Sequence, residues 1–475
     1  MILSLAFFAV GFLIAVLATP WVIRLAVLGI GVDRADESRK NHTGKIVRLG
    51  GLPIMASLSV CLAAIFTLEP GKASEWLPVL VGAVLMYFLG LADDFKPIGA
   101  RKKLLGQLII ASLVYYLGLS VDRVTYPGGN WSVDLGASSY LVTVFWLIAV
   151  PNIVNLIDGF DGVAAGLGVF MAVTLGVVGL QSEQIPVAWF AFTLAGAALG
   201  FLVFNFPPAK IFLGDGGAYL IGYSIAALSL TSYQKGSVGA VLLVTVVGLG
   251  IPIVDTSFTL ARRAFRGFPL FHADGEHIHH RLERLGFSKR RIVLGIYGVC
   301  VVLSLLGLSV FWSQGQTLPI AFGTLFLLAI FTLRYLHFVN TLQDVKTRVA
   351  RTFSRRPIVR YALLQAQILE MEVERCTDAA EFWAMFDLVL QRVGFLDEFE
   401  TKAKPSVEIK VKFGSGGLVR LWAPVELGTR LEWHRIAECF RPAYSAAVKK
   451  WHREHKPARL EHSESPFQDS HFHAF

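Results

Sequence analysis

Acidic side chains lie where apolar runs of the chain begin or end. Asp93 and Asp94 close one run, in the segment Leu-Gly-Leu-Ala-Asp-Asp-Phe, and Asp215 opens another between glycines. Adjacent carboxylates repel one another unless a cation or a proton accompanies them. Carboxylate oxygens are also the ligands that Mg²⁺ prefers. The pair therefore predicts a divalent metal site or a proton-abstracting site, with an ordinary solvated helix end as the alternative for the pair alone, and Asp215 is a further candidate metal ligand.

Amides and carboxylates are also concentrated in residues 151–162. This segment contains Asn152, Asn155, Asp158 and Asp161 together with two glycines. Asn and Asp side chains hydrogen-bond to nucleobases, ribose and sugar hydroxyls, and glycines allow the backbone to approach a ligand closely. A tight interhelical turn would explain the glycines but not so many polar groups. The segment therefore predicts a nucleotide or sugar contact.

A third segment, residues 205–217, begins with Asn205 and leads through Phe212 to Asp215. A carboxylate at the start of a helix complements the helix dipole and is well placed to hold Mg²⁺. A helix cap with no further role is the alternative for Asp215. Phe212 could stack on a uracil or simply face lipid.

Basic and histidine side chains occupy two further segments. The first contains Arg39, Lys40, His42 and Arg48, and the second contains Arg262, Arg263, Asp274, His279 and His280. Arginine and histidine suit phosphate and pyrophosphate. A transition-metal site is the alternative for the histidines, although His277, His279 and His280 are too closely spaced to share one helix face. For the first segment, a plain topology-determining loop is the alternative.

The elements that must position these side chains are apolar. Of 475 residues, 54% are hydrophobic and 17% are charged, whereas a soluble domain has about 25% charged residues. Crossing about 30 Å of hydrocarbon takes roughly 20 apolar residues as a helix. Eleven runs qualify: residues 2–20, 50–68, 76–92, 104–121, 138–154, 163–180, 186–204, 214–230, 238–258, 292–312 and 318–338. The pattern predicts an all-α polytopic membrane protein with about eleven transmembrane helices over residues 1–340, and the first run is expected to be a retained helix.

The loops between these runs predict the orientation. One alternate set carries 19 Lys and Arg residues and the other carries 3, and cytoplasmic loops are the basic ones. The N-terminus is then outside, and every motif above lies on the cytoplasmic side. The sequence pI of about 9.3 follows from this topology, so nucleic-acid binding is not expected.

The remaining residues have a soluble composition. We expect a small cytoplasmic α+β domain over residues 341–460 and a disordered tail over 461–475. Helices are predicted at 358–374, 379–393 and 435–451, and strands at 407–413, 419–422 and 430–433. The four cysteines have no metal-like spacing.

Taken in chain order, the motifs resemble those of the polyprenyl-phosphate N-acetylhexosamine-1-phosphate transferase family. The resemblance covers residues 1–340 and rests on the aspartate pair, the Asn-x-x-Asn-x-x-Asp-Gly-x-Asp-Gly segment from Asn152 and the Gly-Asp-x-Gly motif from Gly214. It implies a homodimeric enzyme of the bacterial inner membrane. Such an enzyme uses Mg²⁺, or Mn²⁺ in its place, to move a sugar 1-phosphate from a UDP-N-acetylhexosamine to undecaprenyl phosphate.

The resemblance also implies a role for each motif. Asp93 and Asp94 would orient or deprotonate the lipid phosphate, and Phe212 would stack on the uracil. Lys103 and Gln107 match a lysine and a glutamine that follow the aspartate pair. The implied catalytic residues are Asp93, Asp94, Asp158, Asp161, His279 and His280, and the implied metal ligands are Asp215, Asp93 and Asp94. The implied substrate-binding residues are Arg39, Lys40, His42, Arg48, Lys103, Asn152, Asn155, Asn205, Phe212, Arg262, Arg263 and Asp274.

The histidine segment bears on the substrate. Asp274 followed by His277-Ile278-His279-His280-Arg281 resembles the branch that acts on UDP-GlcNAc and related UDP-N-acetylhexosamines. The phospho-MurNAc-pentapeptide transferases of peptidoglycan synthesis, the alternative, favour three consecutive histidines and a Phe-Glu. The sequence departs from the family at Val47, where a proline usually precedes Arg48, and this departure weakens the inference for that loop.

An ion-coupled transporter is the more remote alternative, because carboxylates within membrane segments also mark ion pathways. A transporter would place its polar groups near the bilayer midplane, often between inverted repeats. Here the polar groups lie along one face. A catalytically inactive membrane anchor is disfavoured, because all the acidic motifs are present.

Overall fold

The computed structural model describes residues 2–25, 32–33, 46–125, 131–231, 238–266, 282–283, 285–335, 342–396, 405–412, 418–424 and 430–454. The chain divides into two compact units, which are described separately. The larger unit comprises residues 1–34, 44–261 and 273–341, and the smaller comprises residues 35–43, 262–272 and 342–475. The predicted disordered tail, residues 461–475, lies outside the described residues.

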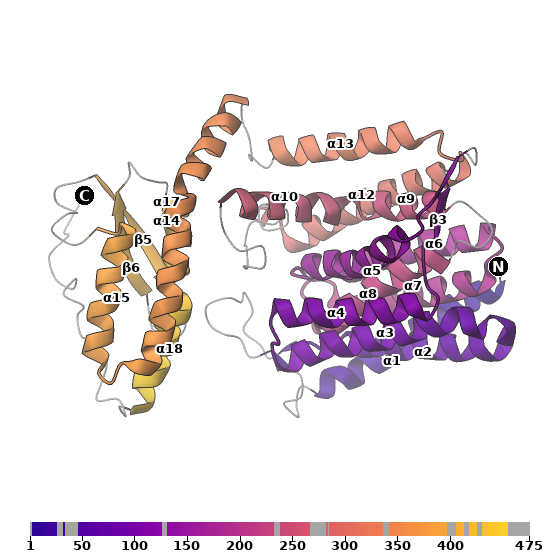
Figure 1. Ribbon diagram of the computed structural model, residues 1–475. Helices are drawn as coiled ribbons and strands as arrows, with labels where there is room; N and C mark the ends of the chain where they lie inside the picture. Colours follow the sequence, from indigo (N-terminus) through magenta and orange to yellow (C-terminus); the bar gives the residue numbers. More distant parts are fainter. Residues whose placement is uncertain are drawn as a thin grey trace. The chain divides into compact units, whose positions relative to one another are not determined.

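The larger unit is a bundle of helices that lie alongside one another (Figure 1). Its helices are α1 (Ile2–Leu25), α2 (Gly51–Leu68), α3 (Ala73–Phe95), α4 (Ala100–Tyr116), α5 (Ser138–Ile157), α6 (Val163–Gln181), α7 (Ile185–Asn205), α8 (Gly214–Thr231), α9 (Val238–Gly248), α10 (Gly250–Arg266), α12 (Lys289–Trp312) and α13 (Leu318–Tyr335). Two short antiparallel hairpins join them: β1 (Val32–Asp33) with β2 (Ile46–Val47), and β3 (Arg123–Thr125) with β4 (Ser132–Asp134).

The predicted all-α membrane architecture is confirmed, but the count of eleven spans is not. Within the described ranges, seven helices are long and apolar enough to cross a membrane, and an eighth span results if α9 and α10 count as one. These two helices meet at a bend of 67°. The apolar run at 238–258 is therefore a broken helix rather than a straight span. The other predicted runs also form helices, which are shorter or less apolar.

Burial within the bundle is uneven, and it separates central from peripheral helices. In the most apolar 18-residue stretch of α7, 83% is buried inside the protein, against 22% for the same length of α1. Helix α8 is buried along nearly all its length. Glycines permit close contacts to α8, since a Cβ on Gly222 would lie 2.5 Å from the Cα of Pro151 in α5. Such close approach of backbones is the usual packing mode of membrane helices. It brings the ends of α3 and α5 next to the start of α8.

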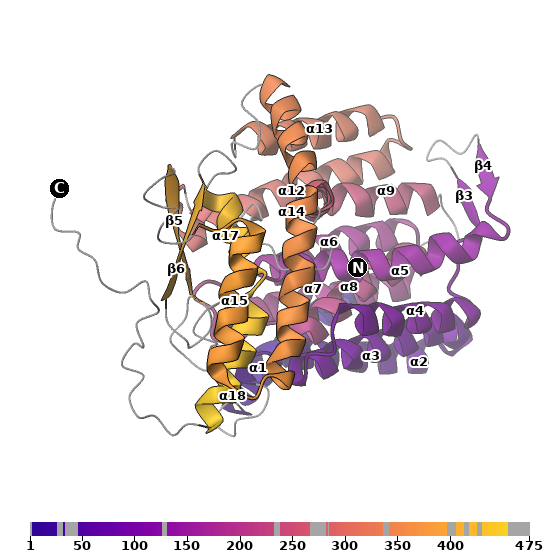
Figure 2. The same cartoon turned by 60° about the vertical axis from the view of Figure 1, so that its left-hand side comes forward.

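The smaller unit is an α+β domain. It contains α14 (Leu342–Arg375), α15 (Ala379–Val393), β5 (Ser406–Lys412), β6 (Leu418–Pro424), α17 (Arg430–Glu438) and α18 (Arg441–Glu454). In Figure 2, α14, α15 and α18 lie beside the β5–β6 hairpin. The hairpin is antiparallel, with Ile409 opposite Leu421. A core rich in aromatic side chains, including Phe382, Phe386 and Phe440, holds these elements together.

One strand prediction in this unit is wrong. Residues 430–433 were expected to form a strand, but they begin helix α17. The buried residues Trp433, Ile436, Ala437 and Phe440 follow a spacing of three, one and three. This is the period of one helix face, and a four-residue window is too short to reveal it.

Candidate active site

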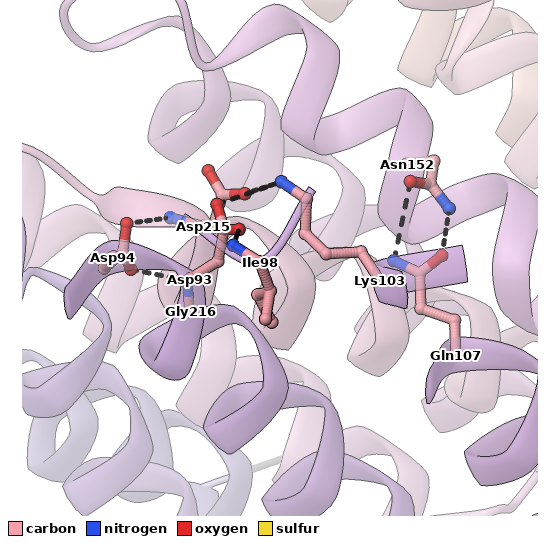
Figure 3. Close-up of polar contacts among 8 residues, drawn as sticks. All are labelled: Asp93, Asp94, Ile98, Lys103, Gln107, Asn152, Asp215 and Gly216. Atoms are coloured by element: carbon pink, nitrogen blue, oxygen red, sulfur yellow. Dashed lines mark hydrogen bonds and ion pairs between the residues drawn. The ribbon is translucent and has the colours of Figure 1, made fainter. Parts of the chain in front are cut away.

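Asp94 joins the end of α3 to the start of α8. Its two carboxylate oxygens accept hydrogen bonds from the backbone N–H groups of Asp215, at 2.9 Å, and Gly216, at 3.0 Å (Figure 3). These N–H groups have no partner within the helix, and a negative charge beside them is favoured by the helix dipole. Asp94 therefore fixes the position of Asp215.

Gly214 makes this junction sterically feasible. Its φ of +75° lies in the left-handed region, which residues with a Cβ adopt only at a cost. A Cβ at this position would also lie 2.7 Å from Oδ2 of Asp94 and against the backbone oxygen of Arg48. The close approach of three segments thus requires glycine here.

Asp93 and Asp215 share one cation, the ammonium group of Lys103. The Nζ of Lys103 lies 3.0 Å from Oδ2 of Asp93 and 2.8 Å from Oδ2 of Asp215 (Figure 3). The other oxygen of Asp93 accepts a hydrogen bond from the N–H of Ile98 at 2.9 Å. The side chains of the three charged residues are between 16% and 24% exposed. Two carboxylates from α3 and α8 therefore converge on one positive charge in a partly buried site.

An amide pair beside this cluster links α4 to α5. Asn152 donates from Nδ2 to Oε1 of Gln107 at 2.7 Å, and Gln107 donates from Nε2 to Oδ1 of Asn152 at 3.5 Å (Figure 3). Asn152 also donates to the backbone oxygen of Ile148. Gln107 is buried. The pair holds the helix that carries Lys103 against the helix that leads to Asp158.

Asn205 and Asp161 connect the two loops that follow α5 and α7. Asn205 accepts from the N–H of Gly162 at 2.9 Å and donates to the backbone oxygen of Ile211 at 2.8 Å. Asp161 accepts from the N–H of Ala209 at 3.3 Å. Asn205 is buried, so its amide holds the two loops together. Its predicted substrate contact is not evident in this geometry.

Asp158 lies in the electrostatic field of the same carboxylates. Burial raises the pKa of Asp158 well above its ordinary value, and the charges of Asp215 and Asp94 raise it further, while Arg48 opposes them. Backbone hydrogen bonds bring the Arg48 segment to Phe212, whose N–H donates to the oxygen of Val47 at 2.9 Å. The structure thus brings together four of the five predicted segments, those that contain Arg48, Asp93, Asp158 and Asp215.

Helix α12 contributes contacts that the sequence analysis missed. Arg290 donates from Nε to the backbone oxygen of Pro207 at 3.0 Å, and the Tyr297 hydroxyl donates to the backbone oxygen of Gly162 at 2.7 Å. One helix therefore holds both loops of the site. The only signal in the sequence was the basic start of an apolar run, which was interpreted as topology alone.

Several predicted residues cannot be placed against this site. Arg262 and Arg263 belong to α10, but their side chains lie outside the described part of the structure. The same holds for the whole of Arg39, Lys40, His42, Asp274, His279 and His280. Asn155 lies at the end of α5, where its backbone oxygen accepts from the N–H of Asp158.

The donor set fits a magnesium ion of the kind that is shared with a substrate. Among the residues that the structure describes, no group of three or more His, Cys, Asp or Glu side chains is arranged to hold a metal. Mg²⁺ bound with substrate phosphates usually takes only one or two protein carboxylates and retains several waters. Asp93 and Asp215, which already converge on one cation, match that requirement. Asp94 is engaged by two backbone amides instead.

Comparisons with known proteins agree with this arrangement. The sequence model of glycosyl transferase family 4 matches residues 76–233, which include Asp93, Asp158 and Asp215. The chain is 35% identical over 326 residues to a probable undecaprenyl-phosphate N-acetylglucosaminyl 1-phosphate transferase of Bacillus subtilis, covering 68% of this chain and 88% of that protein. It is 33% identical over 341 residues to a decaprenyl-phosphate N-acetylglucosaminephosphotransferase of Mycobacterium tuberculosis, covering 66% and 84% of the two chains.

A phospho-N-acetylmuramoyl-pentapeptide-transferase of Listeria monocytogenes is 33% identical over 325 residues, which cover 64% of this chain and 96% of that protein. All three relatives are named as transferases, and each is matched over most of its own length. Some of the described helices that carry the carboxylates are apolar enough to cross a membrane. The others pack between such helices. The chain therefore belongs to glycosyl transferase family 4 and is a multi-pass membrane enzyme.

Proposed function

We propose that this enzyme transfers N-acetylglucosamine 1-phosphate from UDP-GlcNAc to undecaprenyl phosphate, releases UMP and so starts a cell-envelope polysaccharide. The observation that carries the proposal is the convergence of Asp93 and Asp215 on one cation at the end of apolar helices. A pyrophosphate needs cations, and a polyprenyl acceptor needs a membrane. The relatives of Bacillus and Mycobacterium are named for N-acetylglucosamine, with undecaprenyl and decaprenyl phosphate respectively, which supports the choice of sugar and of a polyprenyl phosphate acceptor.

The reaction is a phosphoryl transfer. An oxygen of the polyprenyl phosphate attacks the phosphorus that carries the sugar, a new P–O bond forms, and the bond to the oxygen of UMP breaks. Catalysis of this kind consists mainly of positioning and of stabilising negative charge. When bound, Mg²⁺ would be held by Asp215 and Asp93 and would neutralise charge on the pyrophosphate.

Lys103 has a defined task in this scheme. Its ammonium group balances two carboxylates that would otherwise repel an anionic substrate. If a metal ion were held by the two carboxylates, this ammonium group would be available to pair with a phosphate oxygen. Asp94 acts differently, since it caps α8 and thereby fixes Asp215.

We assign the remaining predicted residues to substrate contact. Asp158, Asp161, Asn155 and Phe212 would face the nucleotide and the sugar. Phosphate or sugar groups would be bound by the residues of the two basic segments, namely Arg39, Lys40, His42, Arg48, Arg262, Arg263, Asp274, His279 and His280. Placement at the cytoplasmic face of a bacterial inner membrane follows from the basic loops, and a homodimer is proposed by resemblance alone.

The test uses purified enzyme, a short polyprenyl phosphate and a panel of UDP-sugars, with UMP and the lipid product identified by mass spectrometry. We expect a lipid carrying pyrophosphate and N-acetylglucosamine. Turnover of UDP-MurNAc-pentapeptide instead would establish the peptidoglycan alternative. Failure of every UDP-sugar to yield a lipid product would refute the proposal.

A further inference from the structure

Helix α14 of the smaller unit has one face that is buried in its own domain. Val359, Ala362, Ala366, Leu369 and Val373 are all buried, and they belong to the core that α15 and α18 share. Their spacing alternates between three and four residues, which places them on one side of the helix. The other sides of α14 would normally be polar.

A second apolar stripe runs along α14, nearly opposite the buried face. It consists of Tyr361, Leu364, Ile368 and Met371, which are 38%, 59%, 43% and 65% exposed. We call these four residues the outer stripe. Their spacing of three, four and three is the a/d pattern of a two-helix coiled coil. Contiguous exposed apolar side chains of this kind mark interaction sites.

The charges beside the outer stripe are separated along the helix. Arg360 precedes the stripe, Gln365 and Gln367 flank its middle, and Glu372 and Glu374 flank its end. Arg375 follows the stripe and pairs with Glu372 at 3.3 Å, so Glu374 carries the net negative charge of this end. If two such helices paired in parallel, Arg360 would face Gln365 and Gln367 would face Glu372 of the other helix, so no pair of opposite charges would form. In an antiparallel pair, Arg360 of each helix faces the acidic end of the other, and Gln367 faces Gln367 near the two-fold axis. Flanking charges of this type set orientation in helix pairs.

We propose that the outer stripe is an interface with a second copy of this chain, in which the two α14 helices pair antiparallel and Tyr361 packs against Met371 of the other copy. A two-fold axis makes such an interface self-complementary. Both copies are confined to one membrane, and confinement raises their effective concentration, so a short interface is sufficient. An anionic lipid surface is a poorer occupant, because Glu372 and Glu374 flank the end of the stripe.

Cysteine crosslinking in the full-length protein, in its membrane, tests the orientation. In the antiparallel pair, position 361 lies next to position 371 of the other copy, and two copies of position 361 are about 15 Å apart along the axis. We expect the double variant Tyr361→Cys/Met371→Cys to form a covalent dimer on mild oxidation. Each single variant should stay monomeric on a denaturing gel. The four native cysteines are buried, and the unsubstituted protein is the control for them.

Every other outcome overturns the proposal. Crosslinking of the single variants would establish a parallel pair. Absence of crosslinking by all variants, with thiols that react freely with maleimide, would mean that the stripe is uncovered. The same absence with protected thiols would mean that lipid or another protein covers it. The native positions are exposed, so these substitutions should not disturb folding.

Charge reversal in the double-cysteine background tests the charge argument separately. Arg360→Glu should lower the crosslinking rate roughly tenfold, because two attractive contacts become repulsive. Adding Glu374→Arg should restore it. The matched control is Arg420→Glu on β6, where the side chain is 62% exposed and lies in a different element, and it should leave the rate unchanged. An equal loss in the control, or no rescue by the second reversal, would refute the assigned register.

Discussion

Replacement of Lys103 by methionine should separate metal binding from turnover. The side chain keeps its unbranched shape and most of its length but loses the charge that Asp93 and Asp215 share. Because both carboxylate oxygens lie within 3.0 Å of the same nitrogen, they are no more than about 6 Å apart, and their repulsion amounts to roughly 3 kcal/mol at an effective dielectric constant of about 20. In the proposed scheme the same ammonium group pairs with a phosphate oxygen when the metal is bound, and loss of an interaction of similar size from the transition state corresponds to a rate reduction of about 100-fold.

The assay is UMP release measured over a range of Mg²⁺ concentrations. With the competing ammonium removed, the carboxylate pair should bind the metal more tightly, so half-saturation should occur at a lower Mg²⁺ concentration while the maximal rate falls. The matched variant Lys103→Arg keeps the charge and should retain more activity. A maximal rate near that of the unsubstituted enzyme, or a half-saturation that rises, would refute the shared-cation argument.

Three further substitutions test other parts of the account. Gly214→Ala should destabilise the start of α8 by at least about 2 kcal/mol, because the left-handed backbone and the contact with Asp94 both oppose a Cβ. We expect a lower Tm in detergent and loss of UMP release. An unchanged Tm would contradict the geometry. Tyr297→Phe should remove one hydrogen bond to Gly162 and reduce turnover about fivefold, with little change in Tm; unaltered kinetics would show that α12 does not position this loop. Lys450→Met should lower the free energy of unfolding of the smaller unit by about 2 kcal/mol, because the ammonium group of Lys450 donates to the backbone oxygens of Val373, Glu374 and Cys376. Limited proteolysis of the full chain in urea measures this change. The control is Lys449→Met, at an exposed neighbouring position.

Much of the membrane fold could be predicted because apolarity is a local property of the chain. Each predicted run is helical, although the run at 238–258 is divided between α9 and α10. In the smaller unit the helices expected at 358–374 and 379–393 are present, whereas the helix expected at 435–451 is divided between α17 and α18. The break between α9 and α10 was missed, because Gly248, Leu249 and Gly250 do not interrupt hydrophobicity. The number of spans depends on length and bending, which a hydropathy pattern does not report.

The residue types of the site could also be predicted, but not the contacts that each residue makes. Asp93 and Asp94 are adjacent in sequence, yet one turns to Lys103 and the other to the amides of α8. Asn205 links two loops from a buried position, a role that the sequence did not indicate, and its substrate contact stays a prediction. These assignments depend on which segments meet in three dimensions. Arg290 and Tyr297 were missed for the same reason, because Arg290 stands in a basic segment that membrane topology alone explains and Tyr297 stands among apolar residues.

The most direct test of the central claim is a single-turnover experiment with Asp215→Asn. Radiolabelled UDP-GlcNAc, polyprenyl phosphate and Mg²⁺ are mixed with the purified variant, and UMP and the labelled lipid are quantified together. The account predicts that both products disappear while the protein keeps its elution profile and its Tm, and that Asp134→Asn, in the exposed β3–β4 hairpin, remains fully active. Formation of both products by Asp215→Asn at a near-normal rate would contradict the claim that the shared carboxylate pair carries the reaction.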